Sequence, residues 1–105
     1  MLVKNRIKKH QEFQEVIAKG ELVRSKFFTF YILENKLGYT RIGISVPKKS
    51  GIAVVRNKIK RQIRAMCARN TDYSKSIDLV MIIKKAYNTE NFAEIEQDIQ
   101  EIFKK

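Results

Sequence analysis

The sequence is poor in the residues on which several classes of protein depend. Its 105 residues include one cysteine, one histidine, one proline and no tryptophan. A single cysteine excludes an internal disulfide and fits a reducing compartment. The longest apolar stretch, residues 79–83, is far shorter than the ~20 residues that cross a bilayer. The N-terminus has neither an apolar run nor a small-residue cleavage pattern. We therefore expect a cytoplasmic protein without a membrane segment.

Groups that could support protein-based catalysis are equally scarce. His10 is expected at the surface at the start of a helix, and Cys67 in the core. Asp72 and Asp78 flank a loop without a third metal ligand nearby. There is no Cys/His spacing typical of a metal site and no glycine-rich phosphate loop. We expect no catalytic residue, no metal site and no cofactor in the protein itself.

Acidic residues are few and unevenly distributed. The chain has 22 Lys+Arg against 11 Asp+Glu, a net charge of +11. Residues 35–71 contain ten basic residues and no acid, whereas residues 90–105 contain five acids and two lysines. So much uncompensated positive charge indicates a polyanionic partner, and we expect nucleic acid rather than a membrane surface. The basic part is the expected binding surface, and the C-terminal segment a scaffold element.

The hydrophobic pattern predicts a single domain over residues 1–105, with no internal repeat or linker. Periods of 3.6 and 2 residues predict helices at residues 9–19, 52–70 and 89–104, and strands at residues 22–26, 27–33, 41–46 and 77–83. Gly20 is expected to end the first helix, and Asn88 or Thr89 to cap the last. The order α-β-β-β-α-β-α predicts an α+β sandwich of helices on one small sheet.

The helix predicted over residues 52–70 has two distinct faces. At 100° per residue, one face is apolar and contains Ile52, Val55, Ile59, Ile63, Met66 and Cys67. The other is basic and contains Arg56, Asn57, Lys58, Lys60, Arg61 and Arg64. Such a face can be merely solvated surface. However, like charges four residues apart are destabilising, and no acid relieves them here. The pattern favours RNA binding, with arginine forks on phosphates.

This basic stretch also resembles a known signature. Residues Arg56-Asn57-Lys58-Ile59-Lys60-Arg61-Gln62-Ile63-Arg64 resemble the R-N-x-x-K-R-x-x-R motif of the bacterial ribonuclease P protein component. The preceding Arg41-Ile42-Gly43-Ile44-Ser45-Val46, Lys48-Lys49 and the Gly-x-Ala-Val step into the helix are similar too. Upstream, the match includes Arg6-Ile7-Lys8-Lys9, Phe13 and Gly20. The resemblance covers nearly the whole chain, in the right order.

The resemblance implies a non-catalytic protein subunit, one per catalytic RNA, that promotes removal of the 5′ leader from precursor tRNA. Magnesium is expected for the RNA-catalysed reaction and not for the protein. The implied fold is the same α-β-β-β-α-β-α sandwich, with a small mixed sheet and a left-handed βαβ crossover. The residues expected to contact the catalytic RNA are Arg56, Asn57, Lys60, Arg61 and Arg64, and Lys58 shares their face.

A second surface implied by the resemblance is a cleft for the extended leader, between the first helix and the open face of the sheet. Strand alternation puts Tyr31 on one face, where Arg41 and Ser45 can lie beside it. Aromatic side chains with cationic edges suit single-stranded RNA, although aromatics of this kind can also be ordinary core. Ile17 stands where many relatives place a second aromatic, so stacking there is expected to be weaker. The predicted leader-binding residues are Phe13, Ile17, Tyr31, Arg41, Ser45, Lys48 and Lys49.

Two other functions are compatible with the composition. A ribosomal or other structural RNA-binding protein would have the same charge, and a stand-alone nuclease would bind the same polymer. The second is disfavoured because the sequence has no constellation of groups for hydrolysis.

Overall fold

The fold is built on strand β4 (Ile77–Ile83), which lies inside the sheet. It pairs antiparallel with β2 (Phe28–Glu34) and parallel with β3 (Arg41–Ser45), and β1 (Glu21–Arg24) extends the sheet beyond β2, giving the order β1-β2-β4-β3. Apolar side chains of β4 are buried on both faces, which confirms the prediction for the run at residues 77–83.

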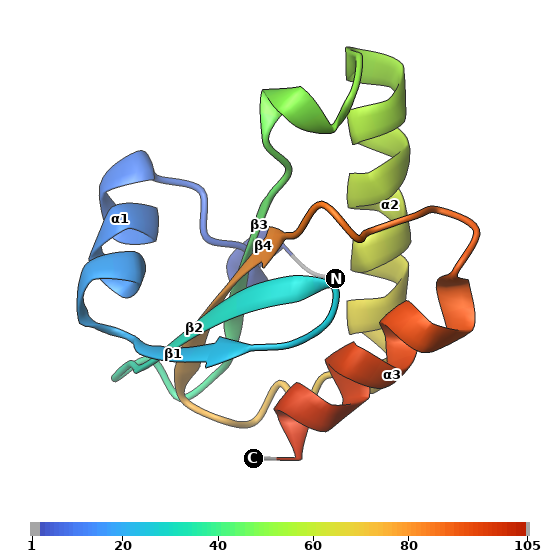
Figure 1. The fold of residues 1–105 in the computed structure, drawn as a ribbon. Helices are drawn as coiled ribbons and strands as arrows, with labels where there is room; N and C mark the ends of the chain where they lie inside the picture. The colour runs from blue at the N-terminus through green and yellow to red at the C-terminus, as the bar shows by residue number, and fades with distance from the viewer. Residues whose placement is uncertain (1–2, 105) are drawn as a thin grey trace.

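The computed structural model describes residues 3–104, and the helices cover both faces of the sheet (Figure 1). Helix α1 (His10–Lys19) lies on one face, and α2 (Ala53–Asn70) and α3 (Phe92–Phe103) lie on the other. Two short 3-10 helices, η1 (Val3–Asn5) and η2 (Lys48–Ser50), precede α1 and α2. Met1, Leu2 and Lys105 lie outside the described residues, and with them part of the N-terminal segment in which we expect no cleavage signal. Within residues 3–104, no helix combines the length and apolarity needed to cross a membrane.

The larger core fills the space between the sheet and helices α2 and α3. Alternate residues of the strands point into it, and one stripe of each helix meets them, as periods of 2 and 3.6 residues require. Its fully buried side chains include Phe28, Phe30, Ile63, Leu79, Met81, Ile95 and Ile99. The α+β sandwich, the mixed sheet and the element order are therefore confirmed.

Strands β3 and β4 are adjacent and parallel, so the chain must cross from one end of the sheet to the other between them. Helix α2 makes that crossing, and β3-α2-β4 is a single βαβ unit. Its left-handed sense remains an expectation from the resemblance.

Two predictions about helix α2 and helix α3 are wrong. Ile52 and Val55 are 71% and 39% exposed and not core, because the first turns of α2 rise beyond the end of the sheet (Figure 1). Helix α3 begins at Phe92, and neither Asn88 nor Thr89 caps it. The Asn88 side-chain oxygen instead accepts a hydrogen bond from the Glu90 N–H in the preceding turn, at 2.9 Å.

Cys67 provides a test of how tightly the larger core is packed. Its side chain is fully buried, 3.9 Å from the Met81 sulfur, and burial raises the pKa of the thiol to about 12. We expect the folded protein to resist alkylation by iodoacetamide at neutral pH, and the urea-unfolded protein to react fully. Mass spectrometry of the labelled protein measures both. Rapid stoichiometric labelling without denaturant would contradict this packing.

Candidate nucleic-acid interface

The face of the sheet that carries α1 has a second, smaller apolar cluster. Of the residues that the structure describes, Ile7, Val16 and Val80 are the ones buried in it. Partly buried side chains pack around them, namely Phe13, Ile17, Tyr31, Leu33 and Ile82. The two predicted cleft aromatics therefore contribute to packing and yet keep part of their surface exposed.

Phe13 lies directly on strand β3, at Gly43. A Cβ atom at Gly43 would be 2.6 Å from Cε2 of the Phe13 ring, which is closer than nonbonded carbon atoms can approach. The absence of a side chain at Gly43 therefore lets the ring approach the strand closely. This contact brings α1 close to β3 at one end of the helix.

A groove runs along β3 between the N-terminal segment and helix α2. The segment is held at the edge of β3 by a hydrogen bond from the Ile7 N–H to the Ile42 carbonyl, 3.0 Å, and by the Asn5 side chain on the Thr40 carbonyl, 2.8 Å. Two adjoining hollows of about 330 and 470 Å³ make up the groove. Its lining residues are Arg6, Ile7, Lys8, Lys9, His10, Phe13, Gln14, Ile42, Ile44, Ser45, Val46, Lys60 and Arg64.

Among the residues that the structure describes, no acidic residue lines this basic groove. Lys60 and Arg64 come from α2, and Arg6, Lys8 and Lys9 from the opposite wall. Nε of Arg64 is buried without a hydrogen-bond partner among residues 3–104. Cationic side chains that line both walls of a hollow favour an anionic ligand.

The predicted basic face of α2 divides into two parts. Lys60 and Arg64 are half-buried along the groove, and Arg56, one turn earlier, donates to the Gly51 carbonyl at 3.1 Å. Asn57, Lys58 and Arg61 are exposed on the outer side of the helix. The helix therefore presents both an open cationic surface and a cationic wall of the groove.

The predicted leader-binding residues do not all lie together. Phe13 and Ser45 line the basic groove, whereas Ile17 and Tyr31 belong to the apolar cluster under α1. Lys48 and Lys49 are exposed on η2, beyond the end of β3. Residues in the N-terminal wall, among them Lys8, Lys9 and His10, were missed as site candidates. Lys8 and Lys9 had two signals in the sequence, the basic run that ends at Lys9 and the resemblance over residues 6–9.

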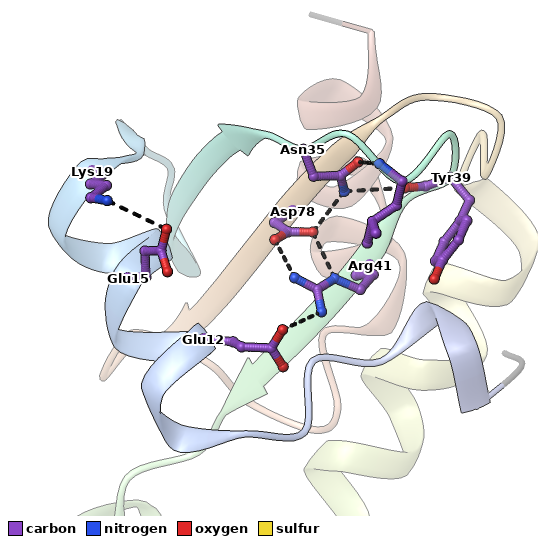
Figure 2. Close-up of polar contacts among 8 residues, drawn as sticks. Glu12, Glu15, Lys19, Asn35, Tyr39, Arg41 and Asp78 are labelled. Atoms are coloured by element: carbon purple, nitrogen blue, oxygen red, sulfur yellow. Dashed lines mark hydrogen bonds and ion pairs between the residues drawn. The ribbon is translucent and has the colours of Figure 1, made fainter.

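Arg41 has partners within the protein. Its Nε and Nη2 donate to the two carboxylate oxygens of Asp78 at 3.0 and 2.6 Å, and its Nη1 donates to Glu12 at 2.8 Å (Figure 2). The hydrogen bond with Asp78 is the largest contribution that raises the pKa of the Arg41 guanidinium. All three donor nitrogens are therefore occupied, although Arg41 lies on the predicted face of β3. Asp78, which appears in the sequence only as an isolated acid beside a loop, is its structural partner.

Within residues 3–104 there is no group of three His, Cys, Asp or Glu side chains arranged to hold a metal ion. The site instead places cationic side chains and the Phe13 ring among aliphatic and neutral polar side chains. Cations and an aromatic ring can bind a polyanion by charge and stacking.

Comparison with known proteins identifies the family. A family model described as Ribonuclease P matches residues 1–105. The chain belongs to this family. It is a protein component of ribonuclease P, hence part of an endoribonuclease that acts in tRNA 5′ processing and, as a ribonucleoprotein, has an RNA partner.

Relatives described as "Ribonuclease P protein component" match over almost their full length. The protein from Clostridium kluyveri is 39% identical over 103 residues, which cover 95% of this chain and 92% of the relative. The protein from Mesoplasma florum is 42% identical over 98 residues, covering 91% and 89%. The solved RNase P protein of Staphylococcus aureus is 35% identical with a TM-score of 0.84, covering 95% of this chain and 93% of the other. That of Thermotoga maritima is 28% identical with a TM-score of 0.84, covering 94% of both.

Replacing Gly43 tests the contact between α1 and β3. Because the new Cβ would clash with the Phe13 ring, we expect Gly43→Ala to destabilise this ribonuclease P protein by about 1–3 kcal/mol, the usual cost of overpacking. Urea unfolding measures the loss. In a Phe13→Ala background the new Cβ no longer meets the ring, so we expect Gly43→Ala to cause a much smaller loss of stability. An equal loss in both backgrounds would disprove the contact.

Proposed function

We propose that the basic groove and the outer face of α2 together form the RNA surface of this ribonuclease P subunit. The α2 face binds the catalytic RNA, and the groove holds the 5′ leader of precursor tRNA. One protein acts with one RNA in the cytoplasm, and the RNA carries out hydrolysis with magnesium. The observation that carries the proposal is the groove itself, which has cations on both walls. Within residues 3–104, no acid lines it and the buried Nε of Arg64 has no hydrogen-bond partner.

Binding of the catalytic RNA is assigned to the side chains of α2 that point outward or along its edge. Arg56, Lys60 and Arg64 follow one another at four-residue intervals, a rise of about 5.4 Å per step. Asn57, Lys58 and Arg61 extend the surface outward. Phosphate contacts of this kind position an RNA without reading its sequence, which suits a subunit that must hold a folded RNA.

Leader binding is assigned mainly to the groove. The exposed part of the Phe13 ring offers a stacking surface, while Ser45 can donate a hydrogen bond and Lys8 and Lys9 can neutralise phosphates. Lys48 and Lys49 continue the cationic track beyond β3. Ile17 and Tyr31 contribute indirectly, through the apolar cluster on which α1 packs. Arg41 contributes through its ion pairs with Glu12 and Asp78.

Reconstitution distinguishes this proposal from its rivals. Purified protein with its cognate catalytic RNA should cleave precursor tRNA at low magnesium, and protein alone should not. Cleavage by rigorously purified protein alone would favour a stand-alone nuclease. Failure to stimulate the catalytic RNA would favour a structural RNA-binding protein.

The α2 face is tested by the salt dependence of catalytic-RNA binding. We expect Arg56→Ala and Arg61→Ala to weaken binding and to reduce the slope of log K against log salt by about one unit at most per lost phosphate contact. Arg24→Ala is the matched control, because Arg24 is exposed on β1 at the opposite edge of the sheet. If the slope is unchanged in both α2 variants, the RNA does not bind this face.

The groove is tested by comparing precursor with mature tRNA. Phe13→Ala removes a stacking surface, so we expect it to weaken precursor binding by about five- to tenfold and to leave mature tRNA binding unchanged. Tyr31→Ala should have the same direction and a smaller size, because Tyr31 lies in the apolar cluster. Titration of the reconstituted enzyme with both tRNAs gives the ratio. Full discrimination in the Phe13 variant would place the leader elsewhere.

A further inference from the structure

Helix α1 is attached to the sheet by little apolar contact. It is ten residues long, and Val16 is its only buried residue. Its N-cap residue Lys9 makes no side-chain capping hydrogen bond. A helix of this length is marginal on its own, and a small apolar cluster is non-directional. Further, directional contacts are therefore needed to set the rotation of α1 about its axis and its position along the sheet.

A chain of polar contacts meets that need. Arg41 and Asp78 face each other across the parallel strands β3 and β4, and Asp78 also accepts a hydrogen bond from the Asn35 side chain at 2.7 Å. The guanidinium of this pair also contacts Glu12 in the first turn of α1 (Figure 2). The side chains of Asp78, Arg41 and Glu12 are 7%, 16% and 37% exposed. These polar contacts therefore extend from the buried sheet to the half-exposed helix.

This contact has directional strength that an ordinary surface ion pair lacks. Arg41 is fixed at its base by two parallel hydrogen bonds to one carboxylate, so its third nitrogen points in a set direction. Among the residues that the structure describes, it forms the one ion pair that joins α1 to the sheet. The other pair on α1, Glu15 with Lys19 at 3.5 Å, lies within the helix and is exposed.

The residue next to Glu12 is Phe13, whose ring lies on Gly43, two residues beyond Arg41 on the same strand. One turn of α1 thus makes two successive contacts with β3, one ionic and one aromatic. If the ionic contact were lost, α1 could rotate or slide, and the ring would move relative to the groove that it lines.

We infer that Glu12, Arg41 and Asp78 are positioning residues for substrate recognition, which hold α1 so that Phe13 faces the leader. The inference rests on the proposed function of the groove. It assigns Arg41 an indirect role in leader binding, through the placement of α1, and it adds Glu12, a residue that does not touch the groove.

The test uses Glu12, because removing Arg41 would leave Asp78 buried without its charge partner and the variant could fail to fold. Enzyme is reconstituted with wild-type protein, Glu12→Gln or Glu12→Ala, and with Glu15→Gln or Glu15→Ala as matched controls on the same helix. We expect Glu12→Ala to reduce the preference for precursor over mature tRNA by about three- to tenfold. The loss should be smaller for Glu12→Gln, which keeps a hydrogen-bond acceptor. The Glu15 variants should retain the wild-type preference, and affinity for the catalytic RNA should stay constant throughout.

A double-variant cycle separates positioning from a general loss of structure. In a Phe13→Ala background, Glu12→Ala should cause no further loss of leader preference, because the ring that it positions is gone. Equal losses in both backgrounds, or a parallel loss of catalytic-RNA affinity, would overturn the inference. If the Glu12 variants keep the wild-type leader preference, the inference about Glu12 is wrong but the proposed function stands. If the wild-type enzyme itself shows no leader preference, the proposed function of the groove is wrong as well.

Discussion

The parallel pairing of β3 with β4 is the constraint on which the rest of the structure depends. Parallel neighbours cannot be joined by a tight turn, and the chain spans the distance with α2. Because α2 returns beside β3, its cationic edge lies along the same strand that carries Gly43 and Ser45. The helix that we propose to bind RNA and the strand that lines the groove are therefore both consequences of one crossing connection.

The two faces of the sheet differ in how firmly they hold their helices. In the part of the chain that the structure describes, fifteen buried residues form the core beneath α2 and α3, whereas three form the cluster beneath α1. Placement of α2 follows from this extensive packing and tolerates a row of like charges on its outer side. Placement of α1 depends on a few specific contacts, the Phe13 ring on Gly43 and the Glu12–Arg41 ion pair. Specific contacts of this kind can be altered without unfolding the domain. The position of α1 is therefore easier to change than that of α2 or α3.

Local sequence patterns predict most of the fold, and the reasons for the exceptions are physical. The strand at residues 77–83 is confirmed with the same bounds, because a continuous apolar run is typical of a strand that is buried on both faces. The apolar stripe of the basic helix holds from Ile59 to Cys67 but not at Ile52 and Val55. Periodicity shows which face of a helix is apolar, but not where along its length the sheet ends.

The candidate site is less accessible to sequence reasoning than the fold. The basic face of α2 can be read from a single helix, because helical geometry alone groups its residues. The ion pair between Arg41 and Asp78 joins residues 37 positions apart, and it depends on the register of two parallel strands. No local pattern specifies that register. For the same reason, local patterns could not show that Phe13 and Ser45 line the groove whereas Ile17 and Tyr31 do not.

Several acidic residues make contacts within the protein and do not neutralise the basic groove. On α3, Glu94 pairs with Lys26, Glu96 pairs with Arg69, and Asp98 accepts a hydrogen bond from the Phe27 N–H at 3.0 Å. These contacts attach α3 to its neighbours on the face of the sheet opposite α1 (Figure 1). Glu12 and Asp78 are in turn occupied by Arg41. With these acids committed to internal contacts, the positive charge along β3 and α2 is left uncompensated in the groove. A polyanion approaching the protein is therefore attracted to the β3 edge of the sheet, along which the basic groove lies.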